Sequence, residues 1–413
     1  MPRADGPEVN PPRECDIAVV GAGILGLAVA RELALRHPGG AVAVLEREPR
    51  IASHQTDHSS GVIHAGIYYR PGSLKAELCV AGARALYQYC AERGIRAERS
   101  GKVIVATEER EIAGLEELER RGSANGVPGL RRIGPDELRE IEPHARGIAA
   151  LHSPATGVVD FSEVARALAA DLALGGGTVS TGCRVHATSA AGERITISHA
   201  GGETSARAAV LCAGAWSDRL AVAAGASPDP RIVPFRGAYL RLRPERRELV
   251  RTSIYPVPDP DLPFLGMHFT RDLEGDVQLG PSALMVGARD AYRLGRVRPR
   301  DLADTLAWPG TWRLARRHWR TGLDELRHGI SRRSFVSELR RFVPELTRAD
   351  VVAGHSGVRA QAVGRDGSLI DDFVVSRTER ALHVRNAPSP AATSALALAG
   401  RIAAMLEEDP GLS

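Results

Sequence analysis

The apolar residues near the amino terminus predict a strand, a helix and a second strand. Residues 16–34 read DIAVVGAGILGLAVARELA, in which a β-branched run is followed by a glycine-rich turn and an apolar stretch with helical period. A second apolar run, VAVLE, ends at Glu46. Short, continuous apolar runs on either side of a helix are typical of a parallel sheet covered by helices. We therefore expect an α/β domain with Rossmann-like topology to start at residue 15.

Apolar patterns much further along the chain supply more strands of the same domain. Residues 207–218, RAAVLCAGAWSD, indicate an apolar strand that ends in glycine and leads into a helix. The stretches at 178–190 and 193–200 alternate like two paired strands separated by a turn. Residues 381–406 indicate a strand, a proline-bounded loop and a long amphipathic helix. The first domain is therefore expected to be discontinuous.

The segments between these pieces predict a second lobe. One contains a strand at 101–107 and a helix within 108–126, and the other contains strand-like runs at 235–243, 263–270 and 277–281. A ligand cleft is expected between the lobes, at the carboxyl ends of the parallel strands. The predicted division is a disordered tail at 1–14, a first domain at 15–90, 151–225 and 346–413, and an inserted α+β domain with a mixed sheet at 91–150 and 226–345.

Composition narrows the class of protein. The chain has 413 residues, of which 43% are apolar and 25% charged, as is ordinary for a globular protein that divides into lobes. A net charge of +4 is mild and argues against nucleic acid as the main partner. No run approaches the ~18 consecutive apolar residues of a membrane-spanning helix. The amino terminus also lacks the apolar core of a secretory signal.

The cysteines indicate a reducing compartment. The five of them are odd in number and scattered, without a C-x-x-C pair, so neither a disulfide framework nor a zinc site is expected. We therefore expect a cytoplasmic protein with no bound metal.

The turn after the first strand has the spacing of a dinucleotide-binding loop. Gly21, Gly23 and Gly26 form G-x-G-x-x-G, in which the glycines allow a tight turn, a close approach to a pyrophosphate and close packing of the helix on the sheet. The helix amino terminus would face the phosphates. Glu46 stands twenty residues after Gly26, where an acid accepts hydrogen bonds from a ribose diol and disfavours a 2′-phosphate. The sequence therefore predicts an adenine dinucleotide without that phosphate.

Several longer segments resemble one family along nearly the whole chain. They are residues 53–79 (SHQTDHSSGVIHAGIYYRPGSLKAELC), 231–240 (RIVPFRGAYL), 254–270 (IYPVPDPDLPFLGMHFT), 357–363 (GVRAQAV) and 386–395 (NAPSPAATSA). In this order they resemble the L-2-hydroxyglutarate dehydrogenase/oxidase family, which belongs to the D-amino-acid-oxidase-like FAD flavoproteins. The resemblance implies bound FAD and oxidation of L-2-hydroxyglutarate to 2-oxoglutarate, with hydride transfer from C2 to the flavin N5. Electrons would then pass to oxygen or to a membrane quinone.

The resemblance also implies which residues bind FAD. A helix amino terminus within PSPAATSA would stabilise negative charge on the reduced flavin, although an ordinary capped helix is the competing interpretation. The residues expected to contact the cofactor are Gly21, Gly23, Ile24, Gly26, Glu46, Arg47, Ser60, Gly61, Val185, Ala213, Gly214, Trp216, Gly357, Ser389, Pro390, Ala391, Ala392 and Thr393.

His64 and Arg359 are the expected catalytic residues. His64, in GVIHAG, is the preferred base because an imidazole can take the substrate's hydroxyl proton near neutral pH. A histidine that only packs or holds the flavin is the alternative, and His54, His58, His268 and His355 are weaker candidates for the base. Arg359 resembles the arginine of a G-x-R element that grips a carboxylate with a guanidinium fork, and a structural arginine bonded to loop carbonyls is the alternative.

Other residues are expected to line the substrate site. Lys75 and Gln361 could serve the second carboxylate of a five-carbon diacid, although Lys75 could equally be a solvated helix residue. The residues placed along the roof of the cleft are Arg236, Tyr239, Tyr255, His268 and Thr270, although the tyrosines could serve packing alone.

The sequence departs from the family pattern at a few positions. Asp57 stands where glycine is common, Ser59 and Ser282 stand where asparagine is common, and Gly287 and Ala288 replace an aromatic residue and a lysine. A carboxylate at Asp57 that faced inward would repel an anionic substrate. These departures bear on which acid is oxidised and leave the FAD prediction unchanged.

The segment 296–341 indicates contact with a membrane surface. It contains twelve arginines and five acidic residues, and Trp308, Trp312 and Trp319 are spaced so that they could share one helical face. Such a helix could lie on the inner face of the cell membrane, where a quinone would be reached. Packing of the tryptophans onto the parent domain is the alternative.

Three functions remain open from the sequence. The first is FAD-dependent oxidation of L-2-hydroxyglutarate, a small dicarboxylate. The second is oxidation of another small 2-hydroxy or 2-amino acid on the same scaffold, and the third is a flavin-binding protein without turnover. The electron acceptor, covalent attachment of FAD and the oligomeric state are left undecided.

Overall fold

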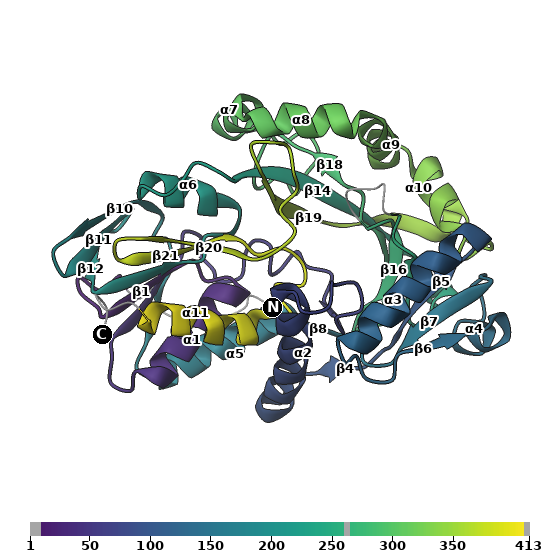
Figure 1. Ribbon diagram of the computed structural model, residues 1–413, viewed down its shortest axis with the longest axis horizontal. Coiled ribbons are helices and arrows are strands. Elements are labelled where there is room, and N and C mark those ends of the chain that lie inside the picture. Colours follow the sequence, from purple (N-terminus) through teal and green to yellow (C-terminus); the bar gives the residue numbers. More distant parts are fainter. Residues whose placement is uncertain (1–9, 260–264, 409–413) are drawn as a thin grey trace.

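Two β-sheets organise the molecule into two lobes (Figure 1). The computed structural model describes residues 10–259 and 265–408. One lobe is built on a six-stranded sheet and the other on a nine-stranded sheet. The predicted α/β class with a second, mixed-sheet lobe is confirmed.

The six-stranded sheet is parallel except at one edge, where β20 runs antiparallel to β21. β1 lies between β2 and β13, with Ile17 opposite both Val42 and Ala208. All four residues of β1 are buried, as expected for a strand covered on both faces. In spatial order the strands are β20 (Val374–Thr378), β21 (Ala381–Asn386), β13 (Ala208–Leu211), β1 (Ile17–Val20), β2 (Val42–Leu45) and β9 (Thr178–Ser180).

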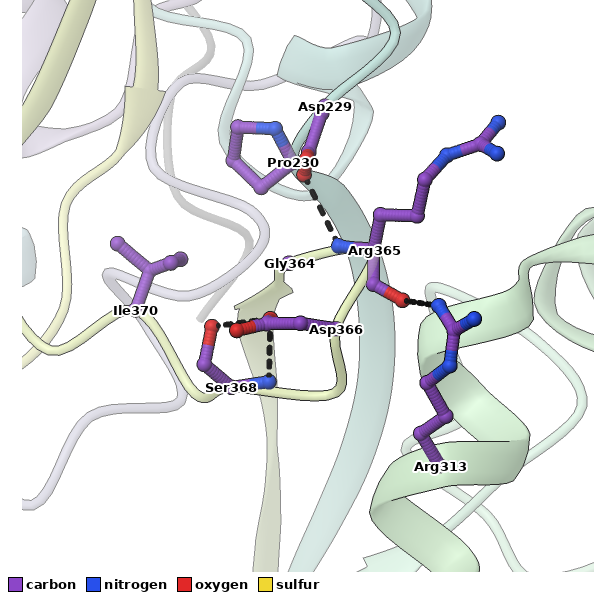
Figure 2. Close-up of a pocket in the computed structure, with 8 residues that line it drawn as sticks. All are labelled: Asp229, Pro230, Arg313, Gly364, Arg365, Asp366, Ser368 and Ile370. Carbon is purple, nitrogen blue, oxygen red and sulfur yellow. Dashed lines mark hydrogen bonds between the residues drawn. The ribbon is translucent and has the colours of Figure 1, made fainter.

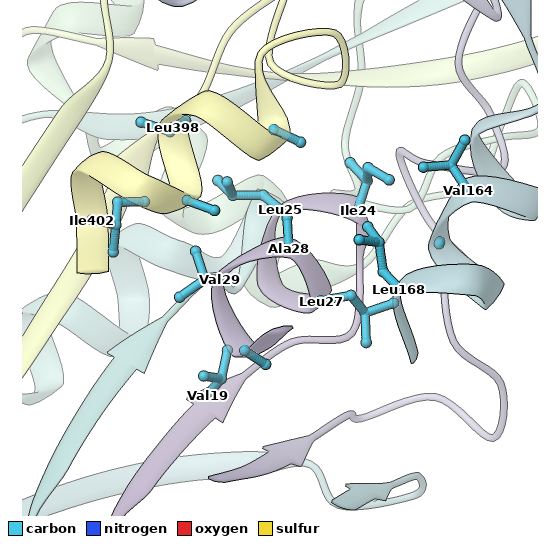
Figure 3. Packing of buried hydrophobic residues seen from close by; sticks show 14 of the residues in the cluster. Val19, Ile24, Leu25, Leu27, Ala28, Val29, Val164, Leu168, Leu398 and Ile402 are labelled. Atoms are coloured by element: carbon cyan, nitrogen blue, oxygen red, sulfur yellow. The ribbon is translucent and has the colours of Figure 1, made fainter. Parts of the chain in front are cut away.

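Helices cover one face of this sheet. Figure 3 shows α1 between α11 and α5, with Leu25, Ala28 and Val29 on the side of Leu398 and Ile402. Burying these side chains contributes roughly 1.5–3 kcal/mol for each large one. The helices are α1 (Ile24–Arg36), α2 (Leu74–Arg93), α5 (Phe161–Leu174) and α11 (Ala395–Glu407).

The opposite face of the six-stranded sheet packs against a small antiparallel sheet. Ala18, Val20 and Ala43, which alternate with the residues facing the helices, form a cluster with Ile195 and Ile197. The small sheet consists of β10 (Val185–Ala191), β11 (Arg194–His199) and β12 (Gly202–Ala206), and α6 (Ser217–Ala223) follows β13.

The nine-stranded sheet forms the frame of the second lobe. Its longest pairing is antiparallel, between β14 and β19. The strands are β18 (Leu284–Met285), β14 (Arg231–Leu242), β17 (Val277–Gly280), β16 (His268–Arg271), β15 (Ser253–Pro256), β5 (Lys102–Ala106), β7 (Ala149–Ser153) and β6 (Arg131–Ile133), with β19 (Val351–Val363) along β14.

The two faces of this sheet differ in chemistry. Val103, Ile254 and Phe269 lie on one face and form an apolar core with Phe335 and Leu339. A row of helices, α7 (Pro299–Ala307), α8 (Pro309–Arg317), α9 (Trp319–Ile330) and α10 (Arg332–Leu339), runs along the outer side of this lobe (Figure 1). The other face carries the polar side chains described below and a second apolar cluster, in which Ile104 and Leu151 pack with Leu115 and Leu118.

Smaller elements complete the fold. A three-stranded sheet joins β3 (Val62–Ile63), β8 (Gly157–Val159) and β4 (Ala97–Glu98). The remaining helices are α3 (Ile112–Ala124), α4 (Pro135–Ile141) and the 3-10 turns η1 (Glu109–Glu111), η2 (Gly214–Trp216), η3 (Pro244–Leu249) and η4 (Arg348–Asp350).

Several details differ from the predictions. The expected return to the first domain at residue 346 falls within the second lobe, because β19 pairs with β14 as far as Val363. Residues 1–9 of the expected disordered tail and residues 260–264 of the third family-like segment lie outside the described residues. The carbonyls of Pro12 and Arg13 accept hydrogen bonds from β12, so the end of that tail is ordered. The helix expected within PSPAATSA begins only at Ala395, after a series of turns.

The three tryptophans do not share one helical face. Trp308 separates α7 from α8 and is buried, and its Nε1 donates to the carbonyl of Val363 at 3.0 Å. Trp312 lies in α8, and Trp319 begins α9. Pro309 and Gly310 interrupt the helical pattern in the sequence, and Pro309 starts α8 as a separate helix because proline cannot continue a helix from the preceding turn.

Candidate active site

The residues predicted to bind a dinucleotide gather at one edge of the six-stranded sheet. The glycine loop follows β1, Glu46 follows β2, η2 follows β13, and Ser389 lies in the loop after β21. These four strands are mutually parallel, so their carboxyl ends meet at the same edge. This edge is where ligands bind in open α/β sheets.

The glycine loop has the close packing that the spacing predicts. Gly21 has a φ of +103°, which favours glycine. A Cβ on Gly26 would lie 1.9 Å from the carbonyl oxygen of Gly21, so helix α1 touches the loop directly. Gly23 is the N-cap of α1 and provides no side-chain cap, while Ile24 N–H donates to Thr56 Oγ1 at 3.0 Å. The loop therefore has the backbone form of an anion-binding helix terminus.

Glu46 is buried beside this loop. Its Oε2 accepts a hydrogen bond from Ala22 N–H at 2.6 Å, and its Oε1 accepts one from Glu48 N–H at 2.9 Å. Burial raises the pKa of the carboxyl, and these two hydrogen bonds oppose that effect. A carboxylate has about four lone-pair directions, so Glu46 keeps acceptor capacity for a ribose diol.

Arg47 and Trp216 come together from the segments that follow two different strands, β2 and β13. The guanidinium of Arg47 lies 3.9 Å from the centroid of the Trp216 ring, and His54 lies on that tryptophan with centroids 4.9 Å apart. Trp216 ends η2, which begins at Gly214 and has Ala213 as its N-cap residue. The cation, the indole and the tilted imidazole therefore form one cluster at the dinucleotide edge.

The other residues expected at the cofactor lie on four further segments. Gly61 follows Ser60, and its carbonyl accepts Val159 N–H at 2.8 Å. Val185 begins β10 opposite His199, and Gly357 lies opposite Gly237 in β19, where a Cβ would meet the carbonyl of His58. Thr393 is buried and accepts a hydrogen bond from His64 N–H at 3.1 Å. Ser389, Pro390, Ala391 and Ala392 precede it in the same loop.

These features fit an FAD molecule. The glycine loop leaves no room for a Cβ at Gly26, a buried carboxylate follows β2, and the N-cap residue of α1 is a glycine without a side chain. The residues expected to hold the cofactor therefore come from seven separate segments of the chain.

His64 lies where the dinucleotide edge meets the second lobe. Its Nε2 faces Ser389 Oγ at 3.5 Å, while its Nδ1 is buried with no hydrogen-bond partner in the described structure. Desolvation, followed by repulsion from Lys102, His268 and Lys75, lowers the pKa of His64 to about 3. The imidazole is therefore neutral at physiological pH and can accept a proton.

Lys102 is the main functional candidate that sequence reasoning missed. It begins β5, is 1% exposed, and its Nζ lies 4.7 Å from the centroid of the Tyr68 ring and 4.5 Å from that of Tyr255. Desolvation lowers its pKa to about 7. In the sequence it only begins an apolar strand, so the single available signal was a lysine next to a continuous buried run.

The strand register explains which side chains surround Lys102. Lys102 lies opposite Ser253 and Ile104 lies opposite Tyr255, while Ile254 lies opposite Phe269. Lys102, Tyr255 and His268 therefore share the face opposite the apolar core. The rings of Tyr255 and His268 stack with centroids 4.0 Å apart.

Arg359 occupies the same region from β19. Its side chain is solvent-accessible, yet the surrounding protein lowers its pKa by desolvation, and both properties together indicate a concave position. Arg359 and Lys102 each lower the pKa of His268, which desolvation brings to about 4. Tyr239 lies near Arg359 and stacks on His355 at 4.5 Å. Arg359, Lys102 and His268 therefore interact electrostatically.

Three of the expected substrate residues have partners within the protein. Lys75 Nζ donates to Asp371 Oδ1 at 2.7 Å and to the Asp371 carbonyl at 2.9 Å. Gln361 Nε2 donates to the carbonyls of Ala362 and Ile370 at 3.0 and 3.2 Å. Arg236 Nε contacts the Tyr292 carbonyl at 3.4 Å. Their assignment to the substrate stays a prediction.

The alternative histidines have other contacts. His54 Nε2 contacts Glu48 Oε1 at 2.8 Å, and the ring of His58 stacks on Tyr292 with centroids 3.8 Å apart.

Among the positions that depart from the family pattern, Asp57 accepts a hydrogen bond from Ser162 at 2.8 Å, and the Ser282 hydroxyl accepts one from Ala238 N–H at 3.2 Å. Asp57 is exposed and bonded to α5.

A surface hollow lies elsewhere, beside the turn that follows β19. Figure 2 shows the Arg313 guanidinium directed at the carbonyl of Arg365, while Asp229 accepts a hydrogen bond from Arg365 N–H at 3.2 Å. The side chain and backbone N–H of Ser368 bond to Asp366. None of the residues predicted to bind FAD or substrate line this hollow, so it is separate from the site above.

The comparisons with known proteins agree with this geometry. The family profile described as FAD dependent oxidoreductase matches residues 16–405. A mitochondrial L-2-hydroxyglutarate dehydrogenase of Nematostella vectensis is 47% identical, over 96% of this chain and 91% of that protein. An L-2-hydroxyglutarate dehydrogenase of Indibacter alkaliphilus is 42% identical, over 94% of this chain and 97% of its own length.

Solved structures share the fold at lower identity. L-alpha-glycerophosphate oxidase from Mycoplasma pneumoniae, a structure with FAD bound, has a TM-score of 0.77 and 20% identity, covering 96% of this chain and 95% of its own. Glycine oxidase from Geobacillus kaustophilus has a TM-score of 0.69 and 20% identity, covering 96% of this chain and 95% of its own. Within the described residues, no helix has both the length and the apolar character needed to cross a bilayer.

Proposed function

The chain belongs to the FAD dependent oxidoreductase family, and on that premise we propose that it oxidises L-2-hydroxyglutarate to 2-oxoglutarate. FAD is its cofactor, as the family and the glycine loop both indicate. The observation that carries the proposal is a neutral, half-buried imidazole at His64 within the electrostatic field of Lys102 and Lys75. Such a site suits a small acid with two negative charges.

Arg359 is assigned to the carboxylate next to the reacting carbon. A guanidinium fork binds a carboxylate through two parallel hydrogen bonds and stays charged even where desolvation lowers its pKa. Its position on β19, two residues after Gly357, places this anchor beside a segment expected at the cofactor. Arg359 would therefore fix the orientation of C2.

His64 is assigned to accept the hydroxyl proton of the substrate. We assign the proton to Nε2, which faces Ser389, because Nδ1 is enclosed by protein. A bound dianion would offset the repulsion from Lys102 and Lys75, and it would raise the pKa of His64 towards the range of an effective base. When bound, FAD supplies the acceptor for the hydrogen and the two electrons that leave C2.

An anaerobic titration tests the assignment of substrate. The purified holoenzyme would be mixed with L-2-hydroxyglutarate, its D-enantiomer, L-lactate or L-glutamate, and bleaching of the flavin absorbance would be recorded. We expect rapid bleaching with L-2-hydroxyglutarate alone. Faster bleaching by glutamate would favour oxidation of a 2-amino acid, and no bleaching by any acid would favour a flavin-binding protein without turnover.

We also propose that the outer helices contact an anionic membrane surface, where a quinone would accept the electrons. Seven of the eleven exposed large apolar side chains of the described residues lie between Leu294 and Leu326. We call this group the outer apolar surface: Leu294, Val297, Leu306, Trp312, Trp319, Leu323 and Leu326. Arginines are frequent in the same helices, which favours anionic lipid.

Vesicle binding tests this second proposal. The enzyme should cosediment with vesicles containing phosphatidylglycerol and should be released by salt. Replacement of Trp312 and Trp319 by serine should weaken binding, whereas replacement of Leu35 and Leu174, exposed on the other lobe, should not. Equal binding of both double variants would contradict the proposal. Oxygen uptake and quinone reduction, measured side by side, would identify the acceptor.

A further inference from the structure

We propose that Lys102 and the hydroxyl of Tyr68 form a subsite for the second carboxylate of the substrate, the one remote from the reacting carbon. This inference rests on the proposed oxidation of L-2-hydroxyglutarate. It assigns the preference for a dicarboxylate substrate to Lys102 and Tyr68 and not to Lys75 and Gln361.

Lys102 is a buried amine without an acidic partner. Among the described residues, no carboxylate forms an ion pair with its Nζ, and its close contacts are the faces of Tyr68 and Tyr255. Desolvating an uncompensated ammonium is costly, and aromatic faces recover only part of that cost. A bound carboxylate would supply the missing charge.

Tyr68 supplies a second donor at the same place. Its hydroxyl is buried with no hydrogen-bond partner in the described structure, and its ring lies against Lys102. A buried hydroxyl without a hydrogen-bond partner is unfavourable unless a ligand supplies that partner. An ammonium and a phenol together can donate to both oxygens of one carboxylate.

The arrangement of cations favours a ligand with two negative charges. Lys102 and Arg359 both act on His268, so this imidazole lies within the field of each. Lys102 also acts on His64, the residue assigned to the hydroxyl proton, whereas Arg359 is not among the groups that shift the pKa of His64. One carboxylate at each cation would place the diacid along the face of β15 and β16.

The competing lysine already has an acidic partner within the protein. Lys75 forms an ion pair with Asp371 at 2.7 Å and a second bond to the Asp371 carbonyl. Binding a carboxylate at Lys75 would require that pair to break or to share its charge. Lys102 needs no such exchange, so it is the better anchor.

The charge of Lys102 should respond to ligand binding. The groups that face it are the rings of Tyr68 and Tyr255, the Cys79 thiol on α2, and the imidazoles of His64 and His268. With a pKa of about 7, roughly half of the ligand-free enzyme carries the proton on Lys102 at neutral pH. A carboxylate would raise this pKa, so binding at pH 8 should take up a proton.

Binding of unreactive acids to the holoenzyme provides the first test. Glutarate has a second carboxylate that butyrate lacks, and neither acid has the hydroxyl group that reacts. Lys102→Met should weaken glutarate binding at least tenfold and leave butyrate binding unchanged, because a charged hydrogen bond is lost only for the diacid. Calorimetry in buffers of different ionisation enthalpy should show proton uptake with glutarate at pH 8 in the wild type and none in the variant.

Kinetics on two substrates provides the second test. Lys102→Met should lower kcat/KM for L-2-hydroxyglutarate at least tenfold relative to kcat/KM for L-2-hydroxybutyrate. Tyr68→Phe, which removes only a hydroxyl, should shift the same ratio in the same direction and serves if the lysine variant does not fold. Arg99→Met is the matched control, because Arg99 stacks on Tyr87 at 4.1 Å on the exposed part of the chain.

The outcomes separate this inference from the proposed function. Unchanged glutarate affinity in Lys102→Met, in an enzyme that oxidises L-2-hydroxyglutarate, would overturn the subsite and leave the function standing. Equal losses on both 2-hydroxy acids would place Lys102 at the reacting carbon and would also overturn it. Glutarate binding that depends on Lys102, in an enzyme that does not oxidise L-2-hydroxyglutarate, would support the subsite and reject the function.

Discussion

The ring of His268 stacks on the ring of Tyr255 with centroids 4.0 Å apart, and this contact joins β16 to β15 beside Lys102. Burial lowers the pKa of His268 to about 4 and raises that of Tyr255, so both rings are neutral over the physiological range. Neutral rings can enclose a cation without competing for the anion that it binds. The stack therefore leaves the charge of the site on Lys102 and Arg359.

Replacing His64 should slow the chemical step without releasing the cofactor. In His64→Ala the substrate hydroxyl loses its proton acceptor, and general-base catalysis is typically worth 10²–10⁴-fold. Stopped-flow reduction by L-2-hydroxyglutarate would measure the rate, and the ratio of flavin to protein absorbance would report retention of FAD. Unchanged reduction kinetics would transfer the role of base to another residue.

The pH profile should report Lys102 rather than His64. Because the pKa of His64 is about 3, that imidazole stays neutral above pH 5 and produces no limb near pH 6.5. Lys102 binds an anion only when protonated, so kcat/KM for L-2-hydroxyglutarate should fall as pH rises above about 7. L-2-Hydroxybutyrate should lack this alkaline limb. A limb shared by both substrates would assign the titration to a different group.

Gly26→Ala should prevent the chain from holding FAD. The new Cβ would lie 1.9 Å from the carbonyl oxygen of Gly21, and backbone cannot move aside as a flexible side chain can. The flavin content of the purified variant measures the effect. Gly134→Ala is the control, since Gly134 has a φ of −84° and nothing lies within 4 Å of its added Cβ. Normal flavin content in Gly26→Ala would mean that FAD binding does not require the close packing of α1 on the glycine loop.

The buried ion pair of Arg289 and Asp218 should contribute strongly to stability. Arg289 Nη2 donates to Asp218 Oδ2 at 2.9 Å and Nη1 donates to the Ala215 carbonyl at 2.6 Å, which ties the loop after β18 to the turn at the dinucleotide edge. Asp218→Asn would remove the carboxylate in direct contact with the buried Arg289 and leave only Asp304 Oδ2 at 4.0 Å, at a cost of about 3–5 kcal/mol.

Urea unfolding would measure this loss of stability. Glu117→Gln, which disrupts the exposed contacts of Glu117 with Arg120 and Arg121, should leave the unfolding midpoint unchanged. Asp218→Asn and Arg289→Met should not be additive, because each removes the same interaction. Additive effects would show that the two side chains act independently.

Local patterns were sufficient to predict the dinucleotide edge. The glycine spacing, the buried strands and the position of Glu46 all depend on residues close together in the chain, and the structure brings them together as expected. The point at which the chain returns to the first domain, predicted at residue 346, could not be placed in the same way. Whether β19 joins one sheet or the other depends on its pairing with β14, about 120 residues earlier.

The contacts at the substrate site required tertiary information. Lys75 stood out because of its motif, but its partner Asp371 lies 296 residues away in the sequence. Lys102 did not stand out, because a lysine at the start of an apolar strand usually faces solvent. Its burial follows from the register of β5 against β15, which places Tyr255 beside it. No pattern within 101–107 contains that pairing.

Alternate side chains of β5 lie on opposite faces of the sheet and serve different purposes. Val103 and Val105 face the apolar core, while Lys102 and Ile104 face the opposite side of the sheet. Selection for a different acid could therefore change Lys102 while the hydrophobic interior keeps its shape. Substrate preference could then change at the even-numbered positions of β5 while the odd-numbered positions continue to stabilise the fold.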